Sequence, residues 1–265
     1  MIHSGKRILL VTLWIAVASP LMAEQRRDSI ADLDALAAQH SWRELGDHLM
    51  DVAPATRDAH WQKLVEQAAI GEVAPLASGS AAYDDKLAAL ERYYPTFPSL
   101  AQSAAFMKLR STIGLDAFRR CFKLASERSM DAATCRDRFV EFVRVEPVDL
   151  ALAKSAAELV TQRDDDAGAA DFYVIELAAG QNICAAPDVA KATVAALGES
   201  AETGEAKAGK ALLERCFDQV KDAVLDRFAV VRPNSPYMQN TCPTLLAHNL
   251  VSGLRAAHCK DLGGG

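Results

Sequence analysis

Residues 115–143, LDAFRRCFKLASERSMDAATCRDRFVEFV, hold the pattern that decides the fold. Apolar side chains recur every three or four residues in both halves, for example around Phe118 and around Phe139. This spacing is typical of one buried face of a helix. Asp131 is a residue type that often caps a helix start. The stretch therefore predicts two helices that are joined by a short turn and pack antiparallel.

Two cysteines lie on either side of this turn, Cys121 about two helical turns before it and Cys135 about one turn after it. Side chains at similar distances from a hairpin corner face each other, so a disulfide is geometrically easy. Cys242 and Cys259 flank a second predicted corner in the same way. We therefore predict the disulfides Cys121–Cys135 and Cys242–Cys259.

The two remaining cysteines, Cys184 and Cys216, form the third predicted disulfide. Cys184 precedes a helix that we expect to begin at Pro187, and Cys216 lies on a long helix that we expect through Leu213 and Phe228. The chain has no Cys-x-x-Cys motif, which argues against catalysis of thiol–disulfide exchange. A zinc site is the alternative use of cysteines, but the set Cys242, His248, His258 and Cys259 fits no common zinc spacing.

The same helical period runs through almost all of the chain, and alternating strand patterns are missing. The predicted fold is all-α, an array of antiparallel helical hairpins, stapled by disulfides, that forms an irregular α-solenoid or bundle of about ten to twelve helices. We expect Gly114 to break or bend its helix. The last two helices are expected at about residues 243–250 and 252–262, after a turn at 233–236.

The domain organisation follows from composition. Pro75, Gly79 and two serines mark residues 73–82 as a linker between an N-terminal helical unit, residues 24–72, and the main helical domain, residues 83–265. Residues 1–23 have a short basic head, an apolar run and a small residue, Ala23, at the end. That layout is typical of a cleavable signal peptide. We therefore expect an exported protein, periplasmic or extracellular, in which disulfides can persist.

The charge balance restricts the partners. The chain has 35 acidic and 29 basic residues, a net charge of −6, and removal of Lys6 and Arg7 with the signal makes it −8. An acidic protein is a poor binder of nucleic acid or of an anionic membrane surface, because both attract basic side chains. No second run is long enough to span a membrane. A basic protein or peptide is the partner that this charge would suit.

Three sequence patterns suggest a cofactor or metal site but lack an essential part. Residues 204–211, GEAKAGKA, lack the Ser or Thr after the lysine that a phosphate-binding loop needs. The spacing of His40, Glu44 and His48 would align metal ligands on one helix, but Ser41 with Glu44 predicts a capping box and a helix start between them. The acidic run 164–166 lacks the ligand spacing of a calcium loop. We therefore predict no metal, no cofactor and no catalytic residue.

The segment Trp42-Arg-Glu-Leu45-Gly46-Asp-His-Leu49 resembles the first helix of a tetratricopeptide repeat, Trp-x2-Leu-Gly-x2-Tyr, with Leu49 in the Tyr position. The resemblance covers eight residues. The alanine of the second helix falls at Ala59 if one residue is inserted, and no match recurs 34 residues later. The resemblance implies a scaffold of stacked hairpins whose groove binds a peptide or protein.

The predicted function is that of an exported binding or interaction module, and one concrete form is an inhibitor or immunity-type protein. The candidate partner site comprises Trp42, Glu44, Asp47 and Trp61, where acidic groups beside aromatic rings would favour a basic partner. The alternative is that both tryptophans are core residues and the acids only solvate the surface. A carrier of a small apolar ligand is the second function class. An enzyme is the least favoured class, because no nucleophile–base or carboxylate pair can be named.

Overall fold

The computed structural model describes residues 28–128 and 131–262, so the predicted signal at 1–23 lies outside the described residues. This part of the chain contains thirteen α-helices and three short 3-10 helices, and no strand lies within it. The elements in chain order are α1 (Ile30–Ala38), α2 (Trp42–His48), η1 (Pro54–Thr56), α3 (Ala59–Val73), η2 (Ala74–Ala77), α4 (Tyr83–Tyr93), η3 (Pro98–Gln102), α5 (Ala104–Arg128), α6 (Ala132–Arg144), α7 (Leu150–Thr161), α8 (Asp166–Ala178), α9 (Pro187–Ala196), α10 (Gly204–Arg215), α11 (Phe217–Val230), α12 (Pro236–Ala247) and α13 (Gly253–Leu262). The all-α prediction is confirmed.

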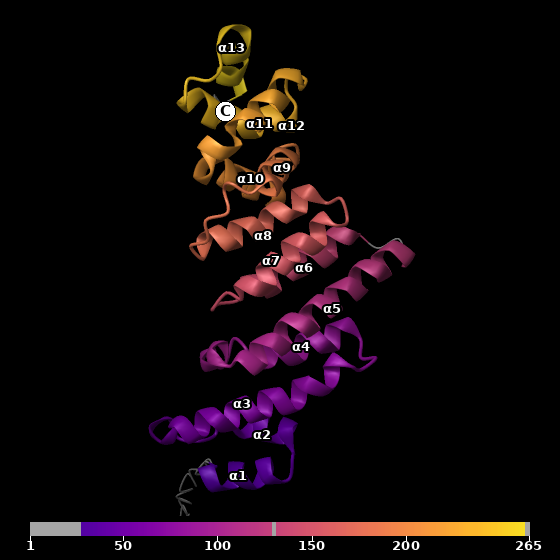
Figure 1. Ribbon diagram of the computed structural model, residues 1–265, viewed down its shortest axis with the longest axis vertical. Coiled ribbons are helices and arrows are strands. Elements are labelled where there is room, and N and C mark those ends of the chain that lie inside the picture. Colours follow the sequence, from indigo (N-terminus) through magenta and orange to yellow (C-terminus); the bar gives the residue numbers. More distant parts are fainter. Residues whose placement is uncertain (1–27, 129–130, 263–265) are drawn as a thin grey trace, which may run out of the picture.

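The helices are stacked along one long axis, from α1 at one end to α13 at the other (Figure 1). The main contacts join a helix to its neighbour or next neighbour in the chain, such as α7 with α8, α8 with α10 and α9 with α11. Such a stack is quasi-one-dimensional, because each unit packs only on the units beside it. The predicted array of helical hairpins with solenoid character is therefore the arrangement found.

A continuous hydrophobic core follows the stack from Leu33 in α1 to Cys259 in α13. Its aromatic centre lies at the hairpin of α5 and α6. The rings of Phe118 and Phe139 stack with their centroids 3.4 Å apart, and Phe172 of α8 lies against Phe139 at 5.3 Å. The two halves of the stretch 115–143 are thus the paired helices that their apolar period predicted.

The three disulfides pair the six cysteines as the sequence predicted. Their Cα–Cα distances are 5.9 Å for Cys121–Cys135, 5.1 Å for Cys184–Cys216 and 5.2 Å for Cys242–Cys259. They join α5 to α6, the segment before α9 to the junction of α10 and α11, and α12 to α13. Because each bond closes a local loop, it removes conformational freedom from the unfolded chain without linking distant parts of the stack.

Two expected helix boundaries were wrong. Helix α5 runs unbroken through Gly114, where a Cβ would lie 2.9 Å from a ring atom of Phe142. The glycine is needed for the close approach of α6 and not for a bend. The long helix expected through Leu213 and Phe228 is two helices, since Cys216 leaves helical geometry at φ −109° and ψ 21°. Cys216, the residue at this break, is the one bonded to Cys184.

Two further expectations at helix starts were also wrong. Helix α12 begins at Pro236, where the hydroxyl of Ser235 accepts the Met238 N–H, and Pro243 lies inside the helix. Ser41 precedes α2 without a side-chain cap, so the expected box with Glu44 is not formed. A box forms instead one helix earlier, at the start of α1. The segment predicted as a linker contains the 3-10 helix η2, which contacts α3 and α5; the division into domains stays a prediction.

No helix among the described residues has the length and apolar character needed to cross a membrane.

Candidate binding surfaces

The predicted site residue Trp42 is half-buried and fixes α2 against α3. A Cβ added at Gly71 of α3 would lie 2.4 Å from two atoms of the Trp42 ring, so the indole covers this glycine directly. His40 also contacts the indole, in an edge-on arrangement with the ring centroids 5.1 Å apart. Trp42 is therefore first a packing residue of the α2–α3 hairpin, with part of its ring left at the surface.

The second aromatic residue of the predicted site, Trp61, is buried. Its indole is 9% exposed, and Nε1 donates a 2.9 Å hydrogen bond to the carbonyl of Leu49. The ring also packs on Phe97, with centroids 5.8 Å apart. An internally satisfied N–H and a covered ring leave little for a partner to contact, so Trp61 lies in the core of the N-terminal hairpins and does not share a surface with Trp42.

The two acidic residues of the predicted site differ in their surroundings. Glu44 is exposed, whereas Asp47 pairs closely with Arg92 of α4. The same guanidinium lies 3.2 Å from Glu72, and Tyr93 donates a 2.6 Å hydrogen bond to Glu72. Burial, the Glu72 hydrogen bond and the Glu72 charge raise the pKa of the Tyr93 phenol. This cluster joins α2, α3 and α4 and borders an open hollow of about 510 Å³.

A partner role for Trp42, Glu44, Asp47 and Trp61 stays a prediction. The structure gives Trp42, Asp47 and Trp61 packing or ion-pair partners within the protein, so their charge and aromatic surface already stabilise the fold. The sequence signal could not distinguish these uses, because the residues that engage the site are not its sequence neighbours. Arg92 comes 45 residues after Asp47, and Gly71, which the Trp42 ring covers, lies on another helix.

His48 lies between two carboxylates that the sequence analysis did not name. Its Nδ1 is 2.7 Å from Asp28 and 3.0 Å from Asp51. Burial lowers the pKa of the imidazole, but the hydrogen bonds and charges of the two carboxylates outweigh this and raise it above 6.5. The three groups could hold a metal ion, but they equally form a partly exposed cluster in which the two carboxylates accept hydrogen bonds from the imidazole. His40 lies outside α2 at φ 57°, so the row of three ligands is not formed.

A buried cluster of charges lies at the middle of the stack. The guanidinium of Arg136 in α6 contacts Glu205 of α10 and lies 3.0 Å from Asp165, the cap of α8. Asp171 of α8 is nearby and buried. Burial raises its pKa to about 6, the charge of Glu205 adds to the rise, and Arg136 opposes it. The cluster ties three helices together, and Asp171 is not among the residues that line the groove described next.

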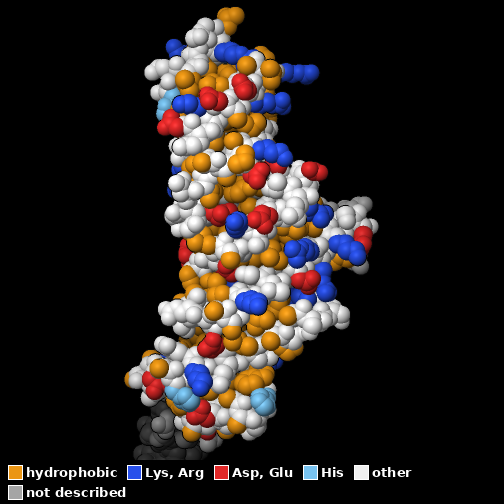
Figure 2. All heavy atoms as spheres, in the orientation of Figure 1, with side chains coloured by type: hydrophobic (Ala, Val, Ile, Leu, Met, Phe, Trp, Pro, Cys, Tyr) orange, Lys and Arg blue, Asp and Glu red, His pale blue; other side chains and the backbone are white. Residues whose placement is uncertain are grey.

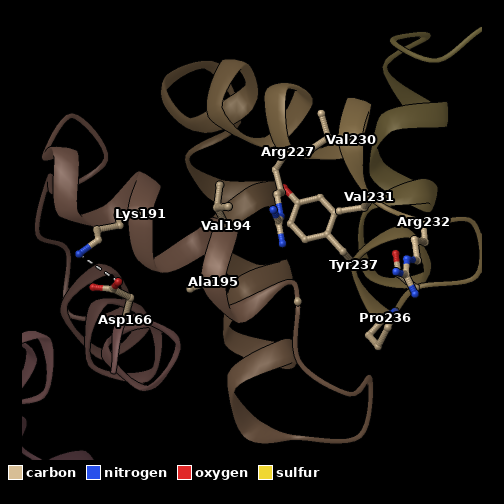
Figure 3. A pocket seen from close by; sticks show the side chains of 12 residues that line it. Asp166, Lys191, Val194, Ala195, Arg227, Val230, Val231, Arg232, Pro236 and Tyr237 are labelled. Carbon is tan, nitrogen blue, oxygen red and sulfur yellow. Dashed lines mark ion pairs between the residues drawn. The ribbon is translucent and has the colours of Figure 1, made fainter. Parts of the chain in front are cut away.

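An open groove of about 680 Å³ lies beside α9, α11 and the start of α12, near the C-terminal end of the stack (Figure 3). Its apolar lining comes from Val194 and Ala195 of α9, Val230 and Val231 at the end of α11, and the ring of Tyr237. Figure 3 shows the Arg227 side chain beside the Tyr237 ring, with Val194 across from it. The other residues that line the groove are Asp166, Lys191, Gly198, Arg232, Ser235 and Pro236.

The charges of this groove are unevenly neutralised. Lys191 lies 3.0 Å from Asp166, the acidic residue of the lining. Arg227 and Arg232 are exposed, and neither guanidinium has an ion pair or hydrogen bond within the part of the chain that the structure describes. Burial raises the pKa of the Tyr237 phenol, and the charge of Arg227 acts against this rise. The groove therefore presents two free cations beside apolar surface.

Sequence reasoning missed this groove. Its signal is the run Arg227-Phe-Ala-Val-Val-Arg232, two arginines around a pair of valines at a helix end. The helical period predicts that Phe228 is buried, but it does not predict that the Val230 side chain is exposed to solvent. The exposure of Val230 depends on where α11 ends relative to α12, and the sequence does not show how these two helices pack.

Comparison with protein-family models, with curated proteins and with solved structures found no match for this chain.

Proposed function

We propose that this protein is an exported, disulfide-stabilised binding module that holds a protein or peptide partner against its helical stack. The observation that carries the proposal is the open groove beside α9, α11 and α12, which combines apolar lining with two arginines that have no ion pair among the described residues. An extended peptide could place apolar side chains against the valines of this groove and charged side chains against its arginines. Stacked helical hairpins commonly serve as binding scaffolds of this kind.

The exported location is part of the proposal. Three disulfides in a chain of 265 residues favour an oxidising compartment, and the basic and apolar start of the sequence favours a cleavable signal. The periplasm and the extracellular space both meet these conditions. An inhibitor or immunity-type role is one form of the proposal, with the exposed acids of the N-terminal end as the site predicted for a basic partner.

The alternative of a small-ligand carrier is less well supported, since carriers enclose most of the surface of their ligand. The groove is open to solvent, and its lining mixes valine side chains with arginines. An enzyme is also less well supported. The buried Asp171 has the raised pKa that catalytic acids often have, but its neighbours Arg136 and Glu205 belong to an ion cluster that joins helices.

A selection with random twelve-residue peptides displayed on phage tests the proposed function. The target is the oxidised protein that begins at residue 24, and the same protein after reduction and alkylation is the matched control. We expect repeated enrichment of related peptides on the oxidised chain and none on the control. Failure to enrich any peptide family, together with a small apolar molecule carried through native mass spectrometry, would favour the carrier instead.

A further inference from the structure

We propose that the groove beside α9, α11 and α12 binds an acidic segment of a partner protein, in which Asp or Glu side chains flank an apolar residue. This inference rests on the proposed function and names the place and the chemistry of binding. It also differs from the expectation of a basic partner, which concerns the opposite end of the stack. Four observations support it in turn: charge, apolar surface, rigidity and the overall charge of the chain.

The groove has an excess of positive charge. Its lining has three basic residues and one acidic residue, and the acid is already engaged by Lys191. No acidic side chain of the lining is therefore left to neutralise Arg227 or Arg232. A guanidinium binds a carboxylate through two parallel N–H···O bonds, which gives both strength and orientation. The two arginines are five residues apart and line one groove, so they suit two carboxylates on one short segment.

The groove also presents apolar surface beside these cations. Val230 is 72% exposed, and it is one of few large hydrophobic residues at the surface of the described chain, with Met50, Leu250 and Leu254. Val194 and Val231 are half-buried in the same lining. Figure 2 shows apolar and basic side chains lying next to each other at this end of the molecule. An apolar side chain of the partner would cover this surface while its acidic neighbours reach the arginines.

The walls of the groove are held in place, which lowers the cost of binding. Asn240 donates to the carbonyls of Leu197 and Glu199 at 3.0 and 2.9 Å, and so fixes the end of α9 next to the groove. Arg255 of α13 donates to the carbonyl of Ala229 at 2.6 Å, directly before Val230. The nearby disulfides hold the same helices. A preorganised surface loses less conformational entropy when a ligand binds.

The overall charge selects a peptide over a nucleic acid. The chain carries a net charge of −6, so a long polyanion would be repelled by most of the surface. Two arginines neutralise few phosphates, and valine side chains offer a phosphate backbone no polar group to bind. A short acidic and apolar segment is attracted locally and is small enough to avoid the remaining charge.

The test uses the peptide families from the phage selection on two variants of the oxidised full chain. Arg227→Gln with Arg232→Gln removes the free charges of the groove. Arg119→Gln with Lys123→Gln removes the same number of charges from exposed positions on α5 and is the matched control. The best peptide is labelled with fluorescein, and its affinity is measured by anisotropy at low and high salt. A version with Gln and Asn in place of Glu and Asp is measured beside it.

We expect enriched peptides with Asp or Glu beside apolar residues, and an affinity about tenfold or more lower for the groove variant, because each lost arginine leaves a carboxylate unpaired. The control variant should bind the selected peptide as tightly as the native protein does. The peptide with Gln and Asn should bind weakly to the native protein and to the control variant alike. Peptides that bind the groove variant unchanged would overturn this inference while leaving the proposed function intact. A single-stranded oligonucleotide that binds more tightly than any peptide would overturn it as well.

Discussion

The two ends of the helical stack use charged side chains in opposite ways. At the N-terminal end, Arg92 is engaged by Asp47 and Glu72 and joins three helices that share no disulfide. At the C-terminal end, disulfides hold the helices, and Arg227 and Arg232 have no ion pair within residues 28–128 and 131–262. The comparison teaches that a charge count along the chain does not show which charges the fold pairs and which it leaves at the surface. What matters is which charges the fold has left unneutralised.

The largest expected effect comes from removing a staple of the C-terminal end. Replacing both Cys184 and Cys216 by Ala should lower the free energy of unfolding by about 3.7 kcal/mol, the chain-entropy value for a closed loop of this length. Hydrogen exchange should then speed up for the backbone amides of α9–α13 and stay unchanged in α1–α4. Equal acceleration of exchange in α1–α4 would show that the two ends unfold as one unit, which would contradict the view that each end is stabilised by its own interactions.

The next effect concerns the packing that replaces disulfides at the N-terminal end. Gly71→Ala places a methyl group against the Trp42 ring and should destabilise the protein by about 1–3 kcal/mol. In a Trp61→Phe background, the emission of Trp42 should shift to longer wavelength as the ring is displaced. The control is Trp42→Ala, in which Gly71→Ala should cost much less. An equal cost with and without the indole would mean that the ring does not rest on Gly71.

Much of the fold was predictable from the sequence. The apolar period around Phe118 and Phe139 predicted the hairpin, and hairpin geometry predicted the pairing of Cys121 with Cys135. Local signals failed where a distant side chain decides the conformation. Gly114 looks like a helix breaker until Phe142 is seen against it.

The candidate site was much less predictable than the fold, for the same reason. Asp47 and Trp61 look available to a partner because Arg92 and Leu49, which engage them, are not marked by any short-range pattern. The exposure of Val230, and the lack of an ion pair for Arg227 among the described residues, depend on how α9, α11 and α12 meet. Periodicity predicts which side chains are buried on a helix, but not which surface charges find a partner.

A pH effect is expected between the two ends, at the buried cluster. The folded pKa of Asp171 is about 6 and the unfolded value about 3.9, so the folded state binds more protons between these values. Stability should therefore fall as pH rises through this window, by on the order of 1–2 kcal/mol. Asp171→Asn should remove the dependence and gain stability at pH 7.5 but little at pH 4. Urea unfolding at both pH values measures this, with the exposed Asp218→Asn as control; equal effects at both would contradict it.

The smallest differences in stability compare the two kinds of arginine directly. Arg92→Gln should lower the free energy of unfolding by about 1–2 kcal/mol, because Glu72 and Asp47 lose their charged partner. Arg227→Gln should change it by less than about 0.5 kcal/mol, as for an exposed residue that has no ion pair among the described residues. Chemical denaturation of both variants at one salt concentration gives the comparison. A larger loss for Arg227→Gln would mean that this arginine serves the fold.

The most direct test of the central claim is the affinity of the selected acidic peptide for these same two variants, measured by fluorescence anisotropy on oxidised protein. The free-charge account predicts that Arg227→Gln weakens binding by about five- to tenfold and that Arg92→Gln leaves it unchanged. The ratio of the two dissociation constants therefore decides the matter. Equal affinities, or weaker binding by Arg92→Gln, would contradict the claim that the unpaired arginines of the C-terminal groove are the recognition site.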